Sequence, residues 1–296
     1  MKSKVIDGKA IAAKIKKEIA AEVATMIDND VKAPHLVAVI VGNDAASQTY
    51  VTSKENACRS VGITSSVYRL ESAATEKELL EMVQFLNHDP DVDGFIVQLP
   101  LPDHIDTDKI IQAIDPKKDV DGFHPENAGR MMLGLPSYHA ATPFGIMELL
   151  RRSKIEVAGK HVVVLGRSNI VGTPLSVMLS RKAAGADATV TLCHSRTANL
   201  KAITLQADIL VAAIGKCGFV TADMVKPGAV VVDVGIHRVE DASKEKGYHL
   251  AGDVDYKQVF EKVAHITPVP GGVGPMTIVS LLQNTLAAAK HSIYQE

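Results

Sequence analysis

Short apolar runs alternate with segments of helical period along most of this chain of 296 residues. The runs at residues 36–42, 63–70 and 94–102 ("LVAVIVG", "ITSSVYRL" and "GFIVQLPLP") have the length and composition of strands. Between them, residues 47–61 and 76–86 place apolar side chains at spacings of three and four, which is the period of a helix. This β-α-β-α-β order predicts a parallel sheet with helices on its faces.

The same alternation returns in the second half of the chain. The runs "KHVVVLG", "ATVTLCH", "ADILVAAIG" and "AVVVDVG" are short and apolar throughout, as parallel strands buried on both faces are. The spacing of apolar residues predicts four further helices, at residues 11–27, 144–152 and 175–183 and from Pro275 onward. A loop-rich tract is expected at residues 115–143.

These patterns predict an α/β protein with two domains. Each domain is a three-layer α/β/α sandwich with a largely parallel sheet, and the second is of the Rossmann type. The first domain is expected at residues 1–143 plus 276–296, and the second at residues 144–275. Because parallel sheets bind ligands at the carboxyl ends of their strands, we expect an active-site cleft between the domains.

Composition removes several classes of function. The net charge of −2 offers no basic field for nucleic acid, and no apolar run approaches the roughly 18 residues of a membrane span. The three cysteines are far apart without a C-x-x-C pair, and the eleven histidines form no ligand pair such as H-E-x-x-H. We therefore expect a cytoplasmic protein with no metal, nucleic-acid partner or membrane contact.

The stretch "VVVLGRSNIVGTP", residues 162–174, resembles a dinucleotide-binding loop with serine at the middle glycine. Gly166 permits a sharp turn after the strand, and Gly172 permits close packing of the following helix. Ser168 adds a hydroxyl, and the helix N-terminus offers free N–H groups to a phosphate. The alternative interpretation is a simple glycine turn between a strand and a helix.

The next strand indicates which dinucleotide would bind. NAD sites usually carry an acidic residue at the end of the second strand, where it contacts the ribose hydroxyl. Here "ATVTLCHSRT" ends in His194, Ser195 and Arg196, so hydroxyl and guanidinium donors replace the acid. This favours the additional phosphate of NADP, while a solvent-facing charged turn remains the alternative. Further on, the "DVGIH" turn supplies backbone groups for the nicotinamide end.

A second group of polar residues lies in the predicted first domain. Tyr50 and Lys54 are four residues apart, on one face of a helix. A lysine among apolar neighbours is a candidate for proton transfer, although it can equally lie over the edge of a core with its ammonium in water. Gln98 stands at the carboxyl end of a predicted strand, where open parallel sheets bind ligands.

Two glycine-containing loops complete the candidate site. "KKDVDGFHPENAGR" places Asp119 and Asp121 in a loop without the spacing of a calcium site. "PVPGGVGPMT" can bring its backbone close to a flat ligand. The alternatives are an Asx-type turn for the first loop and an interdomain turn for the second.

Together these motifs closely resemble those of the bifunctional methylenetetrahydrofolate dehydrogenase/methenyltetrahydrofolate cyclohydrolase family, often called FolD. The matching segments are "YVTSKENAC", "IVQLPLP", "KDVDGFHPENAGR", "GRSNIVGTP", "HSRT", "ADILVAAIGK", "DVGI", "GDVD" and "ITPVPGGVGPMT". They occur in the family's order and span roughly residues 42–285. In one departure, Ala140 and Ala141 stand where many relatives have Pro-Cys, so no thiol is available there.

The resemblance implies NADP-dependent oxidation of methylenetetrahydrofolate, followed by hydrolysis of the methenyl product to formyltetrahydrofolate. Lys54 becomes the proton-transfer residue of the hydrolysis, with Gln98, Tyr50 and Asp121 as its catalytic partners. The implied folate contacts are Tyr50, Gln98, Leu99, Asp121, Pro270, Gly271 and Gly272. The implied NADP contacts are Gly166, Arg167, Ser168, Ser195, Arg196 and Ile236.

The resemblance further implies a homodimer that serves one-carbon metabolism, and through it purine, histidine, methionine and other amino-acid biosynthesis. Two alternatives for the activity stay open. The first is a dehydrogenase without useful cyclohydrolase activity, and the second is a non-catalytic nucleotide-sensing protein that retains the fold. The presence of Tyr50, Lys54 and Gln98 favours the bifunctional enzyme.

Overall fold

The computed structural model describes residues 4–245 and 247–294, which form two compact units. The first unit comprises Ala13–Ala141 and residues 278–294, and the second comprises residues 4–12 and Thr142–Thr277. The predicted boundaries instead put residues 4–12 with the first domain. In the structure the Lys9 N–H donates to the Gly271 carbonyl oxygen at 3.0 Å, which attaches this segment to the second unit.

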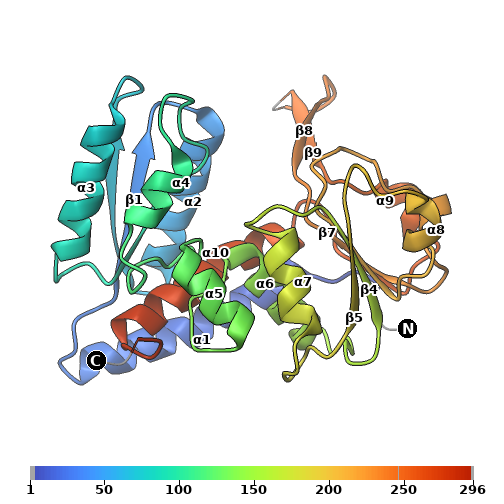
Figure 1. Cartoon of the computed structure of the whole chain (residues 1–296), viewed down its shortest axis with the longest axis horizontal. Coiled ribbons are helices and arrows are strands. Elements are labelled where there is room, and N and C mark those ends of the chain that lie inside the picture. Colours follow the sequence, from blue (N-terminus) through green and yellow to red (C-terminus); the bar gives the residue numbers. More distant parts are fainter. Residues whose placement is uncertain (1–3, 246, 295–296) are drawn as a thin grey trace. The chain divides into compact units, whose positions relative to one another are not determined.

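The sheet of the first unit has three parallel strands in the order β2-β1-β3 (Figure 1). The strands are β1 His35–Val41, β2 Thr64–Leu70 and β3 Gly94–Val97. The central strand β1 is buried on both faces, which explains why "LVAVIV" is apolar without alternation. The predicted β-α-β-α-β order of this unit is confirmed.

Helices cover both faces of this sheet. The helices that carry the first unit are α1 Gly8–Asp28, α2 Ala45–Ser60, α3 Glu76–His88, α4 Thr107–Ala113, α5 Pro125–Leu133 and α10 Val273–Ala289. The start of α3 is fixed by a capping box, because the Thr75 hydroxyl accepts from the Glu78 N–H while the Glu78 carboxylate accepts from the Thr75 N–H. No helix among the described residues is both long enough and apolar enough to span a bilayer.

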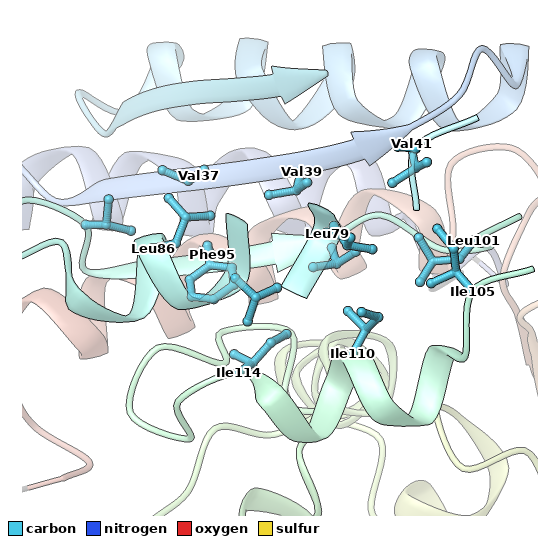
Figure 2. Packing of buried hydrophobic residues seen from close by; sticks show 14 residues of the cluster. Val37, Val39, Val41, Leu79, Leu86, Phe95, Leu101, Ile105, Ile110 and Ile114 are labelled. Carbon is cyan, nitrogen blue, oxygen red and sulfur yellow. The ribbon is translucent and has the colours of Figure 1, made fainter. Parts of the chain in front are cut away.

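One core of the first unit lies between the sheet and helices α3 and α4. Figure 2 shows side chains of β1 and β3 packed against those of the two helices. The fully buried members include Val37, Val39, Leu79, Leu86, Phe95 and Ile110. Helix α2 contacts β1 and β2. The packing fixes where β3 ends, and therefore where the residues after β3 emerge.

The sheet of the second unit has five parallel strands in the order β10-β7-β6-β4-β5. The strands are β4 His161–Leu165, β5 Thr189–Cys193, β6 Ile209–Ala212, β7 Val230–Asp233 and β10 His265–Ile266. Between and around them lie α6 Ala141–Arg152, α7 Gly172–Ser180, α8 Leu200–Thr204, a 3₁₀ turn η1 Ala222–Met224 and α9 Tyr256–Phe260.

Side chains of this sheet alternate between two apolar cores. One core packs Val163, Leu165, Leu210 and Val231 with residues of α8 and α9. The other packs the alternate strand positions with residues of α6 and α7, including Ile146, Leu150, Leu175 and Leu179. Buried side chains on both faces establish the predicted three-layer order for this unit, with the Rossmann-type parallel sheet in the middle.

The predicted loop-rich tract at residues 115–143 contains a helix, α5, which corrects the prediction. His124 caps it, because its ring Nδ1 accepts from the Glu126 N–H at 3.0 Å. Pro125 occupies the first turn, and Gly134 ends the helix in the left-handed region with a φ of 73°. Histidine is a rare cap, so the segment "FHPENAG" gives a weak helix signal by composition.

The short helices α4, α8 and α9 were also not predicted, and the predicted elements differ in extent. Strand β3 ends at Val97 rather than at residue 102, and α7 covers Gly172–Ser180 rather than residues 175–183. Helices α6 and α10 begin at Ala141 and Val273, earlier than predicted. Three strands were missed: β10 and the antiparallel hairpin of β8 His237–Glu240 with β9 Tyr248–Ala251. The missed strands have two to four residues each, too few for a periodicity to register.

We predict that Phe95→Ala lowers the free energy of unfolding by about 3–5 kcal/mol, because the ring is fully buried in the first-unit core. Phe85→Ala is the matched control, since 54% of Phe85 is exposed and its ring forms an edge-on pair with Tyr68. The control should cost about 1 kcal/mol or less. Urea unfolding of both variants measures the difference, and equal losses would contradict the packing described for Phe95.

Candidate active site

Tyr50 and Lys54 lie one turn apart on α2. The helix begins where the Asp44 carboxylate accepts the Ser47 N–H at 2.7 Å, which satisfies a free donor of the first turn. Its buried face carries Val51 and Cys58, both fully inaccessible. Tyr50 is 43% exposed and Lys54 is half-buried beside that face. The amphipathic helix therefore presents a ring and an ammonium group at the edge of the core.

The Gln98 side chain accepts a hydrogen bond from the Lys54 ammonium group. The Nζ of Lys54 donates to Oε1 of Gln98 at 3.1 Å, and Nε2 of Gln98 donates to the Leu99 carbonyl oxygen at 2.7 Å. The backbone N–H of Gln98 donates to the Val39 carbonyl oxygen at 2.8 Å, which continues the β1–β3 ladder. The main chain and both amide atoms of Gln98 are thus fixed, and its oxygen necessarily faces the lysine.

Asp121 belongs to the same group of residues. The segment before Asp121 runs beside β3. The Phe95 N–H donates to the Lys118 carbonyl oxygen at 2.9 Å, and Phe95 and Asp119 form an isolated parallel β-bridge. Burial raises the pKa of Asp121, and the Lys54 ammonium acts in the opposite direction. Lys54 and Gln98 therefore meet at the carboxyl end of β3, and Asp121 lies within electrostatic reach of Lys54.

Buried polar side chains hold the loop that carries Asp121. The Asp119 carboxylate accepts from Nδ2 of Asn127 at 3.0 Å, and both residues are almost inaccessible. On the other side, Nδ2 of Asn284 donates to the Val120 carbonyl oxygen at 2.8 Å. These bonds fix the two residues directly before Asp121, so its position depends on α5 and α10 as well as on the sheet.

The second unit carries the predicted phosphate loop at the carboxyl end of β4. Gly166 adopts a φ of 112°, and a Cβ there would overlap the Ala213 carbonyl oxygen. A Cβ at Gly172 would likewise overlap the Gly166 carbonyl oxygen. Helix α7 follows without any side-chain cap on its first turn. The two glycines therefore permit close backbone packing. In the first turn of α7 the Thr173 N–H donates to the Ser168 carbonyl oxygen at 3.1 Å, and Pro174 has no N–H.

Ser168 and Arg167 shape this loop through their own atoms. The Ser168 hydroxyl accepts from the Val171 N–H at 3.2 Å, and the Thr173 hydroxyl donates to the Arg167 carbonyl oxygen at 3.1 Å. The side chains of Arg167 and Ser168 are exposed. Serine at the middle glycine position thus stabilises the turn, a role that the sequence did not indicate.

Ser195 and Arg196 lie in a tight turn directly after β5, and both are exposed. The turn is closed by the Thr197 hydroxyl, which accepts from the His194 N–H at 2.8 Å, and by His194 Nδ1, which accepts from the Arg196 N–H at 3.2 Å. The Gly166 N–H donates to the Cys193 carbonyl oxygen at 2.9 Å. The phosphate loop and this turn therefore lie side by side at one edge of the sheet.

The remaining predicted contacts also lie in the second unit. Ile236 follows β7 and is 49% exposed, which is unusual for a large apolar side chain at a strand end. Pro270, Gly271 and Gly272 follow β10, and a Cβ on Gly272 would overlap the Pro268 carbonyl oxygen. Among the described residues, no group of three or more histidine, cysteine or acidic side chains has metal-binding geometry.

Comparison with known proteins decides the family. Residues 6–121 match the model described as "Tetrahydrofolate dehydrogenase/cyclohydrolase, catalytic domain". Residues 140–293 match the companion model, "Tetrahydrofolate dehydrogenase/cyclohydrolase, NAD(P)-binding domain". The chain belongs to the tetrahydrofolate dehydrogenase/cyclohydrolase family.

Individual relatives of this family agree over nearly the whole chain. A curated "Bifunctional protein FolD" of Porphyromonas gingivalis is 58% identical over 287 residues, which are 97% of each chain. The FolD crystal structure from Campylobacter jejuni has a TM-score of 0.91 at 47% identity and covers 97% of this chain and 99% of its own. The Trypanosoma brucei enzyme, complexed with NADP and an inhibitor, has a TM-score of 0.91 at 40% identity, with 98% of both chains covered.

The residues of this chain fit a dinucleotide. Gly166 and Gly172 let the loop after β4 pack against carbonyl oxygens that a Cβ would overlap, and the first turn of α7 has no side-chain cap. No carboxylate stands in the His194–Thr197 turn, where a 2′-phosphate would be repelled by one. The structure of this family member therefore retains a phosphate-binding geometry in the second unit.

Two buried polar groups escaped the sequence interpretation. One is the pair of Asp119 and Asn127 beneath the Asp121 loop. The other consists of Asp233 and Asp253, which accept hydrogen bonds beneath the ends of β6 and β7. The available signal was an aspartate close to a glycine in "DVDG", "DVGI" and "GDVD", but a charged side chain in a loop is usually exposed.

We predict that ionisation of Asp119 destabilises the fold. Burial raises the pKa of Asp119 to about 7 from 3.8, against the pull of its hydrogen-bond donors. The stabilising contribution of the protonated group is complete below about pH 4 and is lost as the pH rises through about 7. Wild type should therefore lose stability relative to Asp119→Asn between pH 5 and pH 8. Thermal unfolding of both proteins across this range measures the change, and a constant difference would contradict it.

Proposed function

We infer that the protein oxidises 5,10-methylenetetrahydrofolate with NADP and then hydrolyses the methenyl product to 10-formyltetrahydrofolate. The observation that carries this inference is the Lys54–Gln98 contact of 3.1 Å beside Asp121. A nucleotide-binding domain alone serves many dehydrogenases, whereas this trio supplies an acid–base group and a carboxylate for a folate. The function therefore combines the family membership with a specific set of side chains.

In the oxidation, the C–H bond of the methylene bridge breaks and leaves the methenyl cation. When bound, NADP would supply the acceptor for the hydride and would leave as NADPH. We assign the phosphate cradle to Gly166, Arg167 and Ser168 with the N-terminus of α7. Ser195 and Arg196 donate to the 2′-phosphate from the neighbouring turn. Ile236 packs at the nicotinamide end, which accounts for its exposure after β7.

In the hydrolysis, water adds to the methenyl carbon and loses a proton. The bond from that carbon to N5 then breaks as the remaining proton of the added hydroxyl passes to N5, and the formyl group remains on N10. The amidinium cation is already electrophilic, so a positioned proton-transfer group is sufficient and no Lewis acid is required. Lys54 moves the proton, and Gln98 holds its ammonium group in place. Such assistance is worth roughly 10²–10⁴-fold in rate.

We assign the folate contacts to both glycine-containing loops. Asp121 accepts from the pterin N–H donors, and its position is fixed by the bonds to Asp119 and Val120. The exposed Tyr50 ring packs on the flat part of the folate. The remaining folate contacts are made by Leu99 and by the backbone of Pro270, Gly271 and Gly272. Each of these assignments rests on the position of the residue at a strand or helix end.

The wider role and the assembly stay predictions. A formyl donor of this kind feeds one-carbon metabolism, and we propose that it serves purine, histidine and methionine biosynthesis. We also propose a homodimer in the cytoplasm. Analytical ultracentrifugation measures whether the protein is a dimer, and cell fractionation measures whether it lies in the cytoplasm.

We predict that Lys54→Met slows methenyl hydrolysis by about 100-fold or more, because the proton-transfer group is removed. NADP binding should be unchanged, since Lys54 belongs to the other unit from the phosphate loop. The measurement is a coupled absorbance assay that follows methenyl formation and decay from methylenetetrahydrofolate. Lys77→Met, on the exposed face of α3, is the control and should hydrolyse at the wild-type rate.

Normal methenyl decay in Lys54→Met would remove Lys54 from the mechanism. Methenyl accumulation without decay in the wild type would instead identify a monofunctional dehydrogenase. NADP binding without any folate turnover would identify a nucleotide-sensing protein.

We predict that Arg196→Ala raises the Kd for NADP about tenfold or more and leaves the Kd for NAD nearly unchanged. The lost interaction is a charge-assisted hydrogen bond to a phosphate that only NADP has. Isothermal titration with each dinucleotide measures both constants. Lys182→Ala is the control, because Lys182 is exposed on the loop before β5. Equal weakening for the two dinucleotides would show that Arg196 does not recognise the extra phosphate.

A further inference from the structure

Asp253 is a fully buried carboxylate, and both of its oxygens accept hydrogen bonds. Its Oδ2 accepts the N–H groups of Ile214 and Gly215 at 2.7 and 2.9 Å, and its Oδ1 accepts Nε2 of His237 at 2.8 Å. Because a carboxylate only accepts, the His237 ring carries its proton on Nε2. One side chain thus ties the loop after β6 to the first residue of the β8–β9 hairpin.

A second carboxylate holds Asp253 itself in place. Asp233 accepts the N–H of Asp253 at 2.9 Å and the N–H of Val254 at 3.0 Å, and its own N–H donates to the Thr267 hydroxyl at 2.7 Å. Burying this carboxylate costs free energy, because burial raises the pKa of Asp233 to about 6 despite the N–H groups that donate to it. Two acids buried this closely persist only where many donors compensate them.

Neighbouring glycines are required by the same carboxylates. A Cβ at Gly252 would overlap the Asp233 carboxylate, and a Cβ at Gly235 would overlap the backbone and carboxylate of Asp253. The "DVGI" and "GDVD" segments therefore form one packed unit in the fold. Ile236, which we assign to the nicotinamide end of NADP, lies between Gly235 and His237.

Asp253 is also connected to the phosphate loop, through the peptide between Ala213 and Ile214. The peptide that joins Ala213 and Ile214 turns its N–H toward Asp253, and the Ala213 carbonyl oxygen packs against Gly166 where a Cβ would otherwise lie. Rotation of this peptide would break the hydrogen bond to Asp253 and move the carbonyl oxygen from its packed position against Gly166. Asp253 therefore controls the backbone on which both ends of the dinucleotide site rest.

We propose that Asp253 and His237 are positioning residues of the NADP site: they hold the loop after β6 and the Ile236 backbone in the geometry that binds the dinucleotide. The proposal rests on the proposed function. His237 does not touch the reacting atoms in this scheme. The Nε2–H of His237 donates to Oδ1 of Asp253. Without this donor a buried carboxylate oxygen is left unpaired, which favours rearrangement of the loops that Asp253 holds.

Three substitutions of one residue test the proposal. His237→Gln keeps an N–H donor at the reach of Nε2, His237→Asn keeps a donor that is too short, and His237→Ala removes the donor. A matched control is His249→Ala, because His249 belongs to the same hairpin and pairs with Asp241 at 3.1 Å on the exposed side of the unit. Only the His237 pair connects to the strand-end loops.

The direct readout is the Kd for NADP measured by calorimetry without folate. We expect it to rise about tenfold in His237→Ala and His237→Asn, and to stay within about twofold of wild type in His237→Gln and His249→Ala. The KM for NADP should follow the same order. Hydrolysis of supplied methenyltetrahydrofolate should be unchanged in all four variants, since Lys54 and Gln98 belong to the first unit.

A purely stabilising role gives a different result. In that case His237→Ala lowers the unfolding temperature, while the folded variant binds NADP with the wild-type Kd, and the proposal is wrong. If His237→Ala fails to fold, the comparison of His237→Gln with His237→Asn decides, and equal Kd values for these two would refute it. A wild-type protein that binds NADP but leaves methylenetetrahydrofolate unoxidised would contradict the proposed function, and the Kd series would still test the positioning role.

Discussion

Buried carboxylates that accept N–H groups are the interaction on which both halves of this molecule depend. Asp119 holds the segment before Asp121, and Asp253 holds the loop after β6. A buried carboxylate without donors costs several kcal/mol, so each carboxylate constrains every donor around it. The chemistry-bearing residues lie in loops, and these contacts give the loops a defined geometry.

The carboxylates are not optimal for stability. Burial raises the pKa of Asp119 to about 7 and of Asp233 to about 6, so the folded state resists their ionisation. An apolar core at these positions would cost less in desolvation, but it would leave the backbone N–H groups of the loops unpaired. The structure therefore accepts destabilised acids where loop geometry matters for binding, as functional sites often do.

The two units use one principle with different side chains. In the first unit the strand end supplies Gln98, and a helix supplies the Lys54 ammonium that it orients. In the second unit the strand ends supply backbone, with glycines at 166 and 172 where a Cβ would overlap neighbouring carbonyl oxygens. The first unit thus presents side-chain groups at its strand end, and the second presents mainly closely packed backbone.

Much of the fold was predictable because its signals are local. Fully apolar runs marked β1, β4, β6 and β7, and apolar residues at helical spacing marked α2 and α3. Helix α5, the β8–β9 hairpin and β10 gave weak signals. An unusual histidine cap begins the helix, and the strands are too short to show a period. Among the site residues, Tyr50, Lys54 and Gln98 were visible from spacing and strand ends.

The sequence by itself determined the order of strands and helices, the glycine turn at Gly166 and the identity of the chemical groups, because each depends on residues close together in the chain. Only the tertiary structure decided which partners those groups meet. Lys54 is separated from Gln98 by 44 residues, and Ile214 from Asp253 by 39. Hydrogen bonds over such separations depend on sheet order and packing, and no local pattern encodes which buried acid will face which loop.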